Sequence, residues 1–282
     1  MENPRYAPCK ILLRESIPTL IWFEDAVRRY GVPTMTFDLY LIVPDIQHAA
    51  DVLHRSGWRP KPPSRYSFLV PPCPIQYSRL VRPAPEDERN RNQGDACDSS
   101  SLEAETSVPL FEHNGTVLLS ATEWKISTEE LHEASNNYHF PPLSTLVNRL
   151  VTNWLDAPVG SQLALRLGLM LGYLYEYTSE VKTEEFKQCL ELEHRQFHLD
   201  CLSGQLFMWT LPFARHERQI RENIRQGRHE FRECSVTRTK ENKLLFTDTF
   251  DELAKRRCPY DYPSDVAKAS MELDDDSEED DD

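Results

Sequence analysis

Six arginines in the last third of the chain recur every three or four residues, which places them along one face of a helix predicted over residues 213–231. A row of guanidinium groups is suited to binding phosphate or carboxylate groups, so the row could bind RNA, a nucleotide or an acidic protein. The alternative is an ordinary helix surface on which Glu217 pairs with Arg221, and Glu222 pairs with Arg218 or Arg221. The six residues are Arg215, Arg218, Arg221, Arg225, Arg228 and Arg232.

Two histidines, His194 and His198, are four residues apart within a helix predicted over residues 184–202. This spacing places both imidazole rings on one face, where they could bind zinc. The three residues between them lack the glutamate of the H-E-x-x-H zinc motif, so half-buried packing histidines are the expected alternative. Further candidate ligands close in sequence are Glu193, Asp200 and Cys201.

A third candidate residue, Asp38, lies within residues 18–59, where the hydrophobic period changes twice. The period predicts a helix from Leu20 to Tyr30, ended by Gly31, and then a strand over residues 34–43. Asp45 is a favourable N-cap for a second helix, which ends at Gly57. The order helix, strand, helix is the unit that must position Asp38.

This order, with Gly-Val-Pro before a strand carrying D-x-Y-x-x-V and a final helix ending in Gly-Trp, resembles the opening of nucleotidyltransferase-fold proteins of the abortive-infection and minimal type. It is also similar to fungal proteins. In active members a Gly-Gly or Gly-Ser pair leads a helix, and an Asp-x-Asp or Asp-x-Glu pair on the next strand holds two magnesium ions. Here Phe23 and Glu24 match the small pair, Asp38 matches the surviving carboxylate, and Tyr40 stands in place of the second.

The resemblance implies a catalytically degenerate protein that acts as a binding or interaction module, because a two-metal site needs several carboxylates. No cofactor is then expected, and Asp38 is a structural residue. The rival hypothesis is an active nucleotidyltransferase that uses Mg²⁺, with Asp38 as catalytic metal ligand and Glu24, Glu112 or Glu123 completing the site. A third hypothesis is a helical scaffold unrelated to nucleotides.

Composition bounds these hypotheses. The chain has 282 residues and 39% hydrophobic content, enough for one or two domains. Residues 271–282 hold nine acids and no base, so the rest of the chain carries only −5 of the net charge of −14. No overall basic excess favours nucleic-acid binding. No apolar run predicts a membrane partner, and seven scattered cysteines without C-x-x-C indicate a reduced, cytoplasmic or nuclear setting.

The predicted fold class is α+β, with a nucleotidyltransferase-like mixed sheet and flanking helices over residues 1–126 and a helical domain over 127–257. Residues 83–107 are expected to be a disordered insertion and residues 258–282 a disordered acidic tail. The insertion contains phosphorylatable serines at 99–101, and Ser277 lies within the tail. The tail is expected to dock weakly on the arginine row, as an intramolecular partner that competes with a nucleotide or an acidic protein.

Several finer elements are predicted in chain order. Short strands are expected at residues 66–70, 75–81, 108–111 and 116–120, the last two joined as a hairpin by Asn-Gly. Residues 9–13 are interpreted as either a strand or the lead-in to a helix. Ser127 or Thr128 is the expected N-cap of a helix, and a further amphipathic helix runs from Leu143 to Trp154. Residues 163–177 are apolar nearly all round, so they predict the central helix of the second half.

Overall fold

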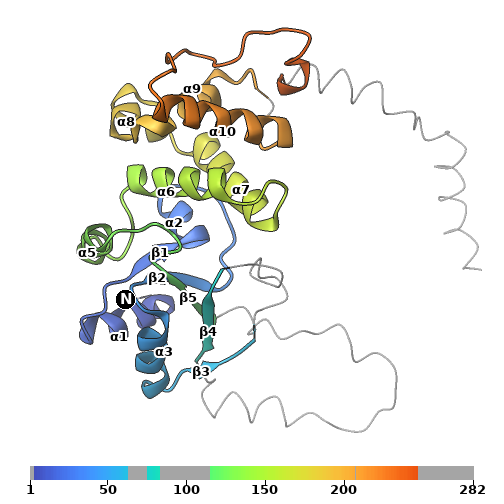
Figure 1. Ribbon diagram of the computed structural model, residues 1–282. Helices are drawn as coiled ribbons and strands as arrows, with labels where there is room; N and C mark the ends of the chain where they lie inside the picture. The colour runs from blue at the N-terminus through green and yellow to red at the C-terminus, as the bar shows by residue number, and fades with distance from the viewer. Residues whose placement is uncertain (1–2, 63–74, 83–114, 207, 247–282) are drawn as a thin grey trace, which may run out of the picture.

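A computed structural model describes residues 3–62, 75–82, 115–206 and 208–246 (Figure 1). The described chain is a mixed α/β protein built on a five-stranded sheet of order β1-β2-β5-β4-β3. β2 and β5 are parallel, and the other neighbouring strands are antiparallel. The strands are β1 (Leu20–Trp22), β2 (Leu39–Val43), β3 (Arg59–Pro60), β4 (Tyr77–Val81) and β5 (Gly115–Ser120).

Helices precede, interrupt and follow the sheet. The α-helices are α1 (Ala7–Arg14), α2 (Phe23–Arg29), α3 (Ile46–Arg55), α5 (Thr128–Asn136), α6 (Leu143–Asp156), α7 (Gln162–Tyr177), α8 (Glu184–Cys189), α9 (Arg195–Ser203) and α10 (Leu211–Arg225). Short 3₁₀ helices are η1 (Pro4–Tyr6), η3 (Glu180–Lys182), η4 (Leu192–His194) and η5 (Lys243–Leu245). The predicted caps are confirmed: Asp45 accepts a hydrogen bond from the His48 backbone, and Ser127 forms a capping box with Glu130.

The prediction for residues 18–59 gives a helix, a strand and a second helix in the right order, but it is wrong about where the first two begin. β1 pairs with β2 where a helix was expected, and the helix α2 begins only at Phe23. β1 is three residues long and buried throughout, and periodicity cannot distinguish a short buried strand from a helix. β2 begins at Leu39, later than predicted. Residues 9–13 lie in the helix α1.

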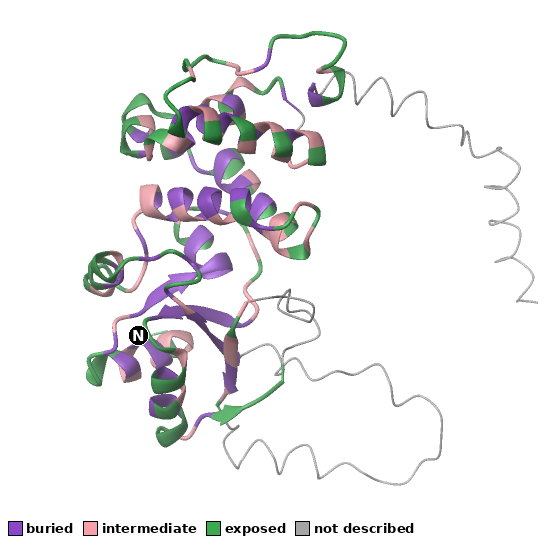
Figure 2. Cartoon of the chain, in the orientation of Figure 1, coloured by how far each residue is buried: buried purple, intermediate pink, exposed green. Residues whose placement is uncertain are grey.

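Both faces of the sheet are covered, and strand alternation decides which side chain faces which layer (Figures 1 and 2). Leu39, Leu41 and Val43 of β2 join the cluster formed with α1 and α3. Tyr40 and Ile42 point to the other face, toward α2 and the helices beyond it. Central strands buried on both faces explain why β2 is a continuous apolar run.

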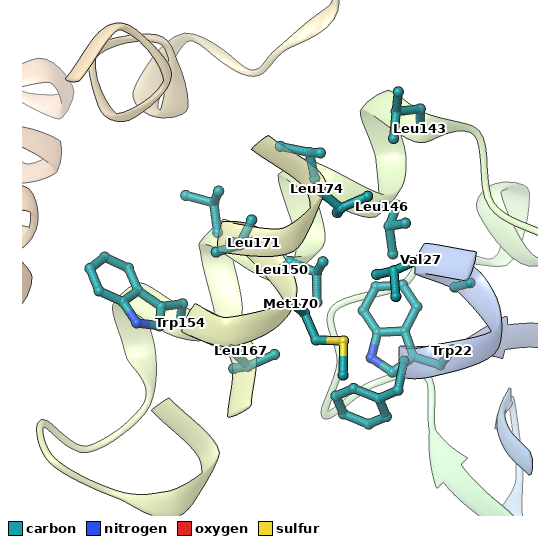
Figure 3. Close-up of a cluster of buried hydrophobic side chains, with 14 of the residues drawn as sticks. Trp22, Val27, Leu143, Leu146, Leu150, Trp154, Leu167, Met170, Leu171 and Leu174 are labelled. Carbon is teal, nitrogen blue, oxygen red and sulfur yellow. The ribbon is translucent and has the colours of Figure 1, made fainter. Parts of the chain in front are cut away.

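One hydrophobic cluster crosses the predicted domain boundary at residue 126. Trp22 of β1 and Val27 of α2 pack with Leu146 and Leu150 of α6 and Met170 of α7 (Figure 3). The helical half therefore shares its core with the sheet. The boundary stays a prediction, while the described residues from 127 to 206 and from 208 to 246 are largely helical.

α7 was predicted to be a central helix, and the structure buries only one of its faces. Its inner face, including Leu167, Leu171 and Leu174, is buried. Its outer face exposes an apolar stripe at every fourth residue: Leu165, Leu169, Tyr173 and Tyr177. We call these four residues the α7 stripe. Contiguous exposed apolar side chains of this kind commonly mark surfaces that contact other proteins.

The single helix predicted over residues 184–202 is wrong, because the chain is divided into α8, η4 and α9. Leu190 and Glu191 are extended, with ψ of 146° and 144°. The backbone N–H of Glu191 donates to the Asn148 side chain at 3.0 Å instead of to a helical carbonyl, and the Leu190 side chain is buried. A side-chain acceptor from α6 and burial of one leucine thus outweigh helix propensity.

Residues 66–70, 83–107, 108–111 and 258–282, for which strands, an insertion and a tail are predicted, lie outside the described residues. The two strands on either side of residues 83–107 are nevertheless neighbours in the sheet, because Val81 of β4 is paired with Gly115 of β5. Antiparallel neighbours can be joined by a short connection.

Deleting residues 83–107 is therefore expected to leave the melting temperature within about 2 °C of that of the full chain, as for surface changes of roughly 0.5 kcal/mol. Thermal unfolding followed by circular dichroism measures this. A fall of several degrees would show that the deleted segment packs on the protein, and the prediction of a dispensable insertion would be wrong.

Candidate functional site

Asp38, the candidate metal ligand, is held by an arginine. Asp38 is 2% exposed, and its carboxylate accepts hydrogen bonds from Arg79 Nε at 2.8 Å and Arg79 Nη2 at 3.1 Å. The Gly115 backbone N–H donates to Asp38 Oδ1 at 2.9 Å. A Cβ at position 115 would lie 2.7 Å from that oxygen, so this close approach requires glycine. Asp38 thus ties the beginning of β2 to β4 and β5.

The positions that match the small pair of the resemblance carry large or paired side chains. Phe23 lies at the junction of β1 and α2 with φ of +54°, a left-handed conformation that favours glycine. Its buried ring packs edge-on against Tyr40 and Trp124, with ring centroids 5.0 Å and 5.1 Å away. The neighbouring Glu24 is buried and forms an ion pair with Arg166 of α7. Aromatic packing fills this part of the fold.

The other acids expected near Asp38 lie elsewhere or are not described. Glu123 is exposed and accepts hydrogen bonds from the Gln76 backbone N–H. Glu112 lies outside the described residues. In the part of the chain that the structure describes, two groups of side chains could hold a metal ion, and neither contains Asp38.

Mg²⁺ does not fit the matching positions. Both oxygens of Asp38 are bonded to Arg79, and a tyrosine replaces the second carboxylate. Comparison with protein-family models, curated proteins and solved structures finds no match. Within the described ranges, no helix is both long enough and apolar enough to span a membrane.

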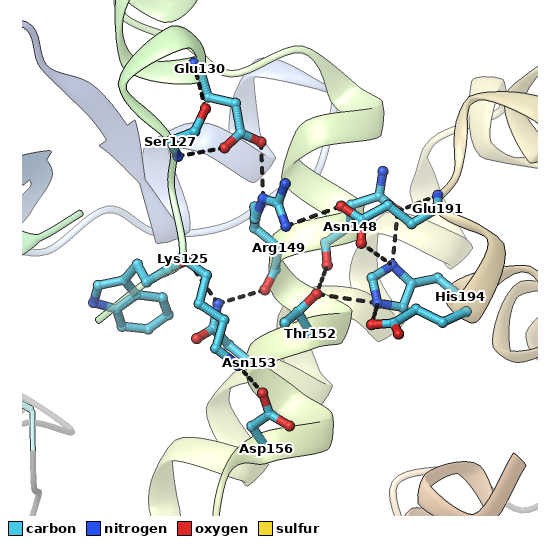
Figure 4. A network of polar contacts seen from close by, with 12 residues as sticks. Lys125, Ser127, Glu130, Asn148, Arg149, Thr152, Asn153, Asp156, Glu191 and His194 are labelled. Atoms are coloured by element: carbon cyan, nitrogen blue, oxygen red, sulfur yellow. Dashed lines mark hydrogen bonds and ion pairs between the residues drawn. The ribbon is translucent and has the colours of Figure 1, made fainter. Parts of the chain in front are cut away.

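His194 and His198 do not form a common site, because each is bonded to a different part of the interior. His194 Nδ1 lies 2.9 Å from Asn148 Oδ1, and its Nε2 lies 3.2 Å from Thr152 Oγ1 (Figure 4). His198 Nδ1 lies 2.9 Å from the Tyr175 hydroxyl. Burial lowers the pKa of each imidazole to about 4. Both are fully buried packing residues, not half-buried ones.

The arginine row is shorter than predicted. α10 ends at Arg225, and Gly227 follows in a left-handed conformation with φ of +66°. Arg228 donates its backbone N–H to Asn223, so Arg228 and Arg232 lie beyond the helix. Gly227 is a helix stop signal in the sequence. The prediction extended the helix past it because the arginines continue to recur every three or four residues.

The central arginines of the row bind groups of the same chain. Arg218 donates to the Ala157 carbonyl, and Arg221 pairs with Asp156 at 2.6 Å. Arg225 forms two hydrogen bonds with Glu193, at 2.6 and 3.0 Å. These contacts replace the pairs that were expected within the helix.

The two ends of the arginine row remain accessible. Arg215 and Arg228 are exposed and pair with no acid that the structure describes. Arg232 pairs with Glu230 at the surface. Docking of the acidic tail, which lies outside the described residues, stays a prediction, and it would have to compete with Asp156 and Glu193 for the central arginines.

In the first of the two candidate metal groups, the side chains already have partners within the chain. Glu191 and Glu193 lie near His194, but they pair with Arg149 and Arg225, and both nitrogens of His194 are bonded.

The second candidate group consists of Asp200 of α9 with His216 and Glu217 of α10. Asp200 was predicted to lie near His194 and His198, but the structure groups it with His216. The sequence does mark Glu217 as a candidate. It falls on the apolar face formed by Phe213, Ile220 and Ile224, where a charged residue is unusual.

Proposed function

We propose that this protein is a catalytically degenerate member of the nucleotidyltransferase fold that acts as a binding or interaction module. The observation that carries the proposal is the packing of Phe23 against Tyr40 and Trp124. Phe23 and Tyr40 occupy the positions where the resemblance expects a small residue and a metal-binding carboxylate. All three rings are buried.

Two physical arguments support the absence of phosphoryl transfer. A small pair at the start of a helix lets backbone N–H groups approach phosphates, and a phenyl ring at position 23 fills that space. Phosphoryl transfer also needs metal ions held by several carboxylates, whereas Asp38 is neutralised by Arg79. The third hypothesis, a helical scaffold unrelated to nucleotides, stays a prediction.

The α7 stripe supports the second part of the proposal, that the protein acts by binding. Apolar side chains at every fourth position of a helix suit contact with an apolar face of a partner protein. Arg215 and Arg228 are exposed and pair with no acid among the described residues, so a nucleotide or an acidic protein could reach them.

The proposal predicts no magnesium-dependent turnover of nucleoside triphosphates. The purified full chain is incubated with Mg²⁺ and each labelled nucleoside triphosphate, alone and with candidate acceptor proteins, and labelled products are separated. We expect no product above that of a buffer control. Product that disappears in a folded Asp38→Asn variant and persists in Glu133→Gln, which changes an exposed acid on α5, would establish the active transferase instead.

A further inference from the structure

Three side chains with metal-binding atoms meet between α9 and α10. Asp200, His216 and Glu217 each place one ligand atom within 4.8 Å of the others. Asp200 is 0% exposed and Glu217 is 1% exposed, so neither carboxyl group is a surface acid. His216 is partly exposed.

The two carboxyl groups have oxygens that lack a hydrogen-bond donor. Asp200 Oδ1 accepts from the Ser235 backbone N–H at 2.7 Å and from Gln196 Nε2 at 3.2 Å. Asp200 Oδ2 and Glu217 Oε1 are buried and have no hydrogen-bond partner among the described residues. Burial, then the charge of Asp200, raises the pKa of Glu217 well above its usual value. Two adjacent buried carboxylates need either a shared proton or a cation between them.

His216 and Asp200 share a hydrogen-bond partner, Ser235. His216 Nε2 lies 2.7 Å from Ser235 Oγ, and the same Ser235 donates its backbone N–H to Asp200. Metal-binding histidines commonly use one ring nitrogen for the ion and the other for a supporting hydrogen bond. Ser235 therefore links two of the three candidate ligands.

We propose that Asp200, His216 and Glu217 bind a divalent cation of the zinc class, with two carboxylate oxygens and one imidazole nitrogen as ligands. An imidazole ligand favours zinc over calcium and magnesium, which prefer all-oxygen sites. The ion would neutralise both carboxylates and fasten α9 to α10. Through Ser235 it would also hold the segment that follows α10.

Zinc binding is tested on the full chain after chelator treatment and transfer to metal-free buffer at neutral pH. Calorimetric titration with ZnCl₂ is expected to show one ion per chain, and the melting temperature is expected to rise with zinc but not with Mg²⁺ or Ca²⁺. Glu217→Gln keeps the side-chain volume and removes a ligand charge. It should weaken zinc binding by more than about 100-fold, beyond the roughly 10–100-fold cost of losing a supporting partner.

Two matched controls locate the ion. Glu222→Gln makes the same chemical change at an exposed position of the same helix, and Glu193→Gln alters the other candidate group. Both are expected to retain zinc affinity. Circular dichroism verifies that each variant is folded, and Asp200→Asn provides a second test of the ligand set. Loss of binding in Glu193→Gln but not in Glu217→Gln would overturn the proposal, as would absence of zinc binding by the folded wild-type chain.

Cobalt substitution tests the ligand types independently of stability. We expect visible absorption bands of Co²⁺ bound by nitrogen and oxygen, without the intense near-ultraviolet absorption of a thiolate ligand. Thiolate absorption would assign the ion to Cys201 or Cys234, which lie near Glu217, and would overturn the proposed ligand set.

Discussion

Replacing Arg79 with methionine is expected to destabilise the protein by about 3–5 kcal/mol, the cost of leaving a buried charge without its partner. Asp38 is 2% exposed, and after the substitution the Gly115 N–H would be its one remaining donor among the bonds described for it. Methionine retains most of the apolar stem of arginine, so lost packing contributes little. Urea unfolding followed by fluorescence measures the free energy of unfolding.

Two further variants isolate the buried pair. In Asp38→Asn/Arg79→Met no uncompensated charge remains, so the double variant is expected to be more stable than Arg79→Met alone. Arg232→Met removes a guanidinium from a surface pair with Glu230 and should change stability by less than about 1 kcal/mol. If Arg79→Met behaved like Arg232→Met, the bridge to Asp38 would not be a structural tie.

Replacing Phe23 with alanine is expected to cost about 3–5 kcal/mol, because it removes a buried ring from the contacts with Tyr40 and Trp124. Phe23→Gly should be more stable than Phe23→Ala by about 1 kcal/mol, although it deletes one more carbon. The reason is the φ of +54°, which alanine adopts with strain and glycine adopts freely.

Ala26 provides the matched comparison, since it lies within the same short helix α2. There glycine is expected to be worse than alanine by about 1 kcal/mol, the usual helix-interior difference. Denaturant unfolding of the four chains (wild type, Phe23→Ala, Phe23→Gly and Ala26→Gly) measures both differences. Equal stability of the two Phe23 variants would mean that the backbone at position 23 relaxes once the ring is removed.

The sequence predicted the helices that carry a clear local signal, either a capping residue or a long apolar face. α3 and α5 begin at good N-caps, and α6 and α7 have long apolar faces. β1 could not be recognised because its identity as a strand depends on pairing with β2, which local periodicity does not encode.

Local sequence signals also could not show which site residues contact one another. The partner of Asp38 is 41 residues away along the chain, and the contact exists because antiparallel and parallel pairing bring three strands together. Asp200 and Glu217 come from different helices, and their proximity follows from how α9 and α10 pack. Residue type identified each of them as chemically capable, but tertiary packing decided with which residue each one interacts.

The hydrophobic cluster shared by the sheet and the second half limits how the protein can be divided. A fragment beginning at residue 127 would present Leu146, Leu150 and Met170 to water, since Trp22 and Val27 cover them in the whole chain. Such a newly exposed apolar surface promotes aggregation and recognition by chaperones. A fragment that begins at residue 127 is therefore expected to aggregate more readily than the whole chain.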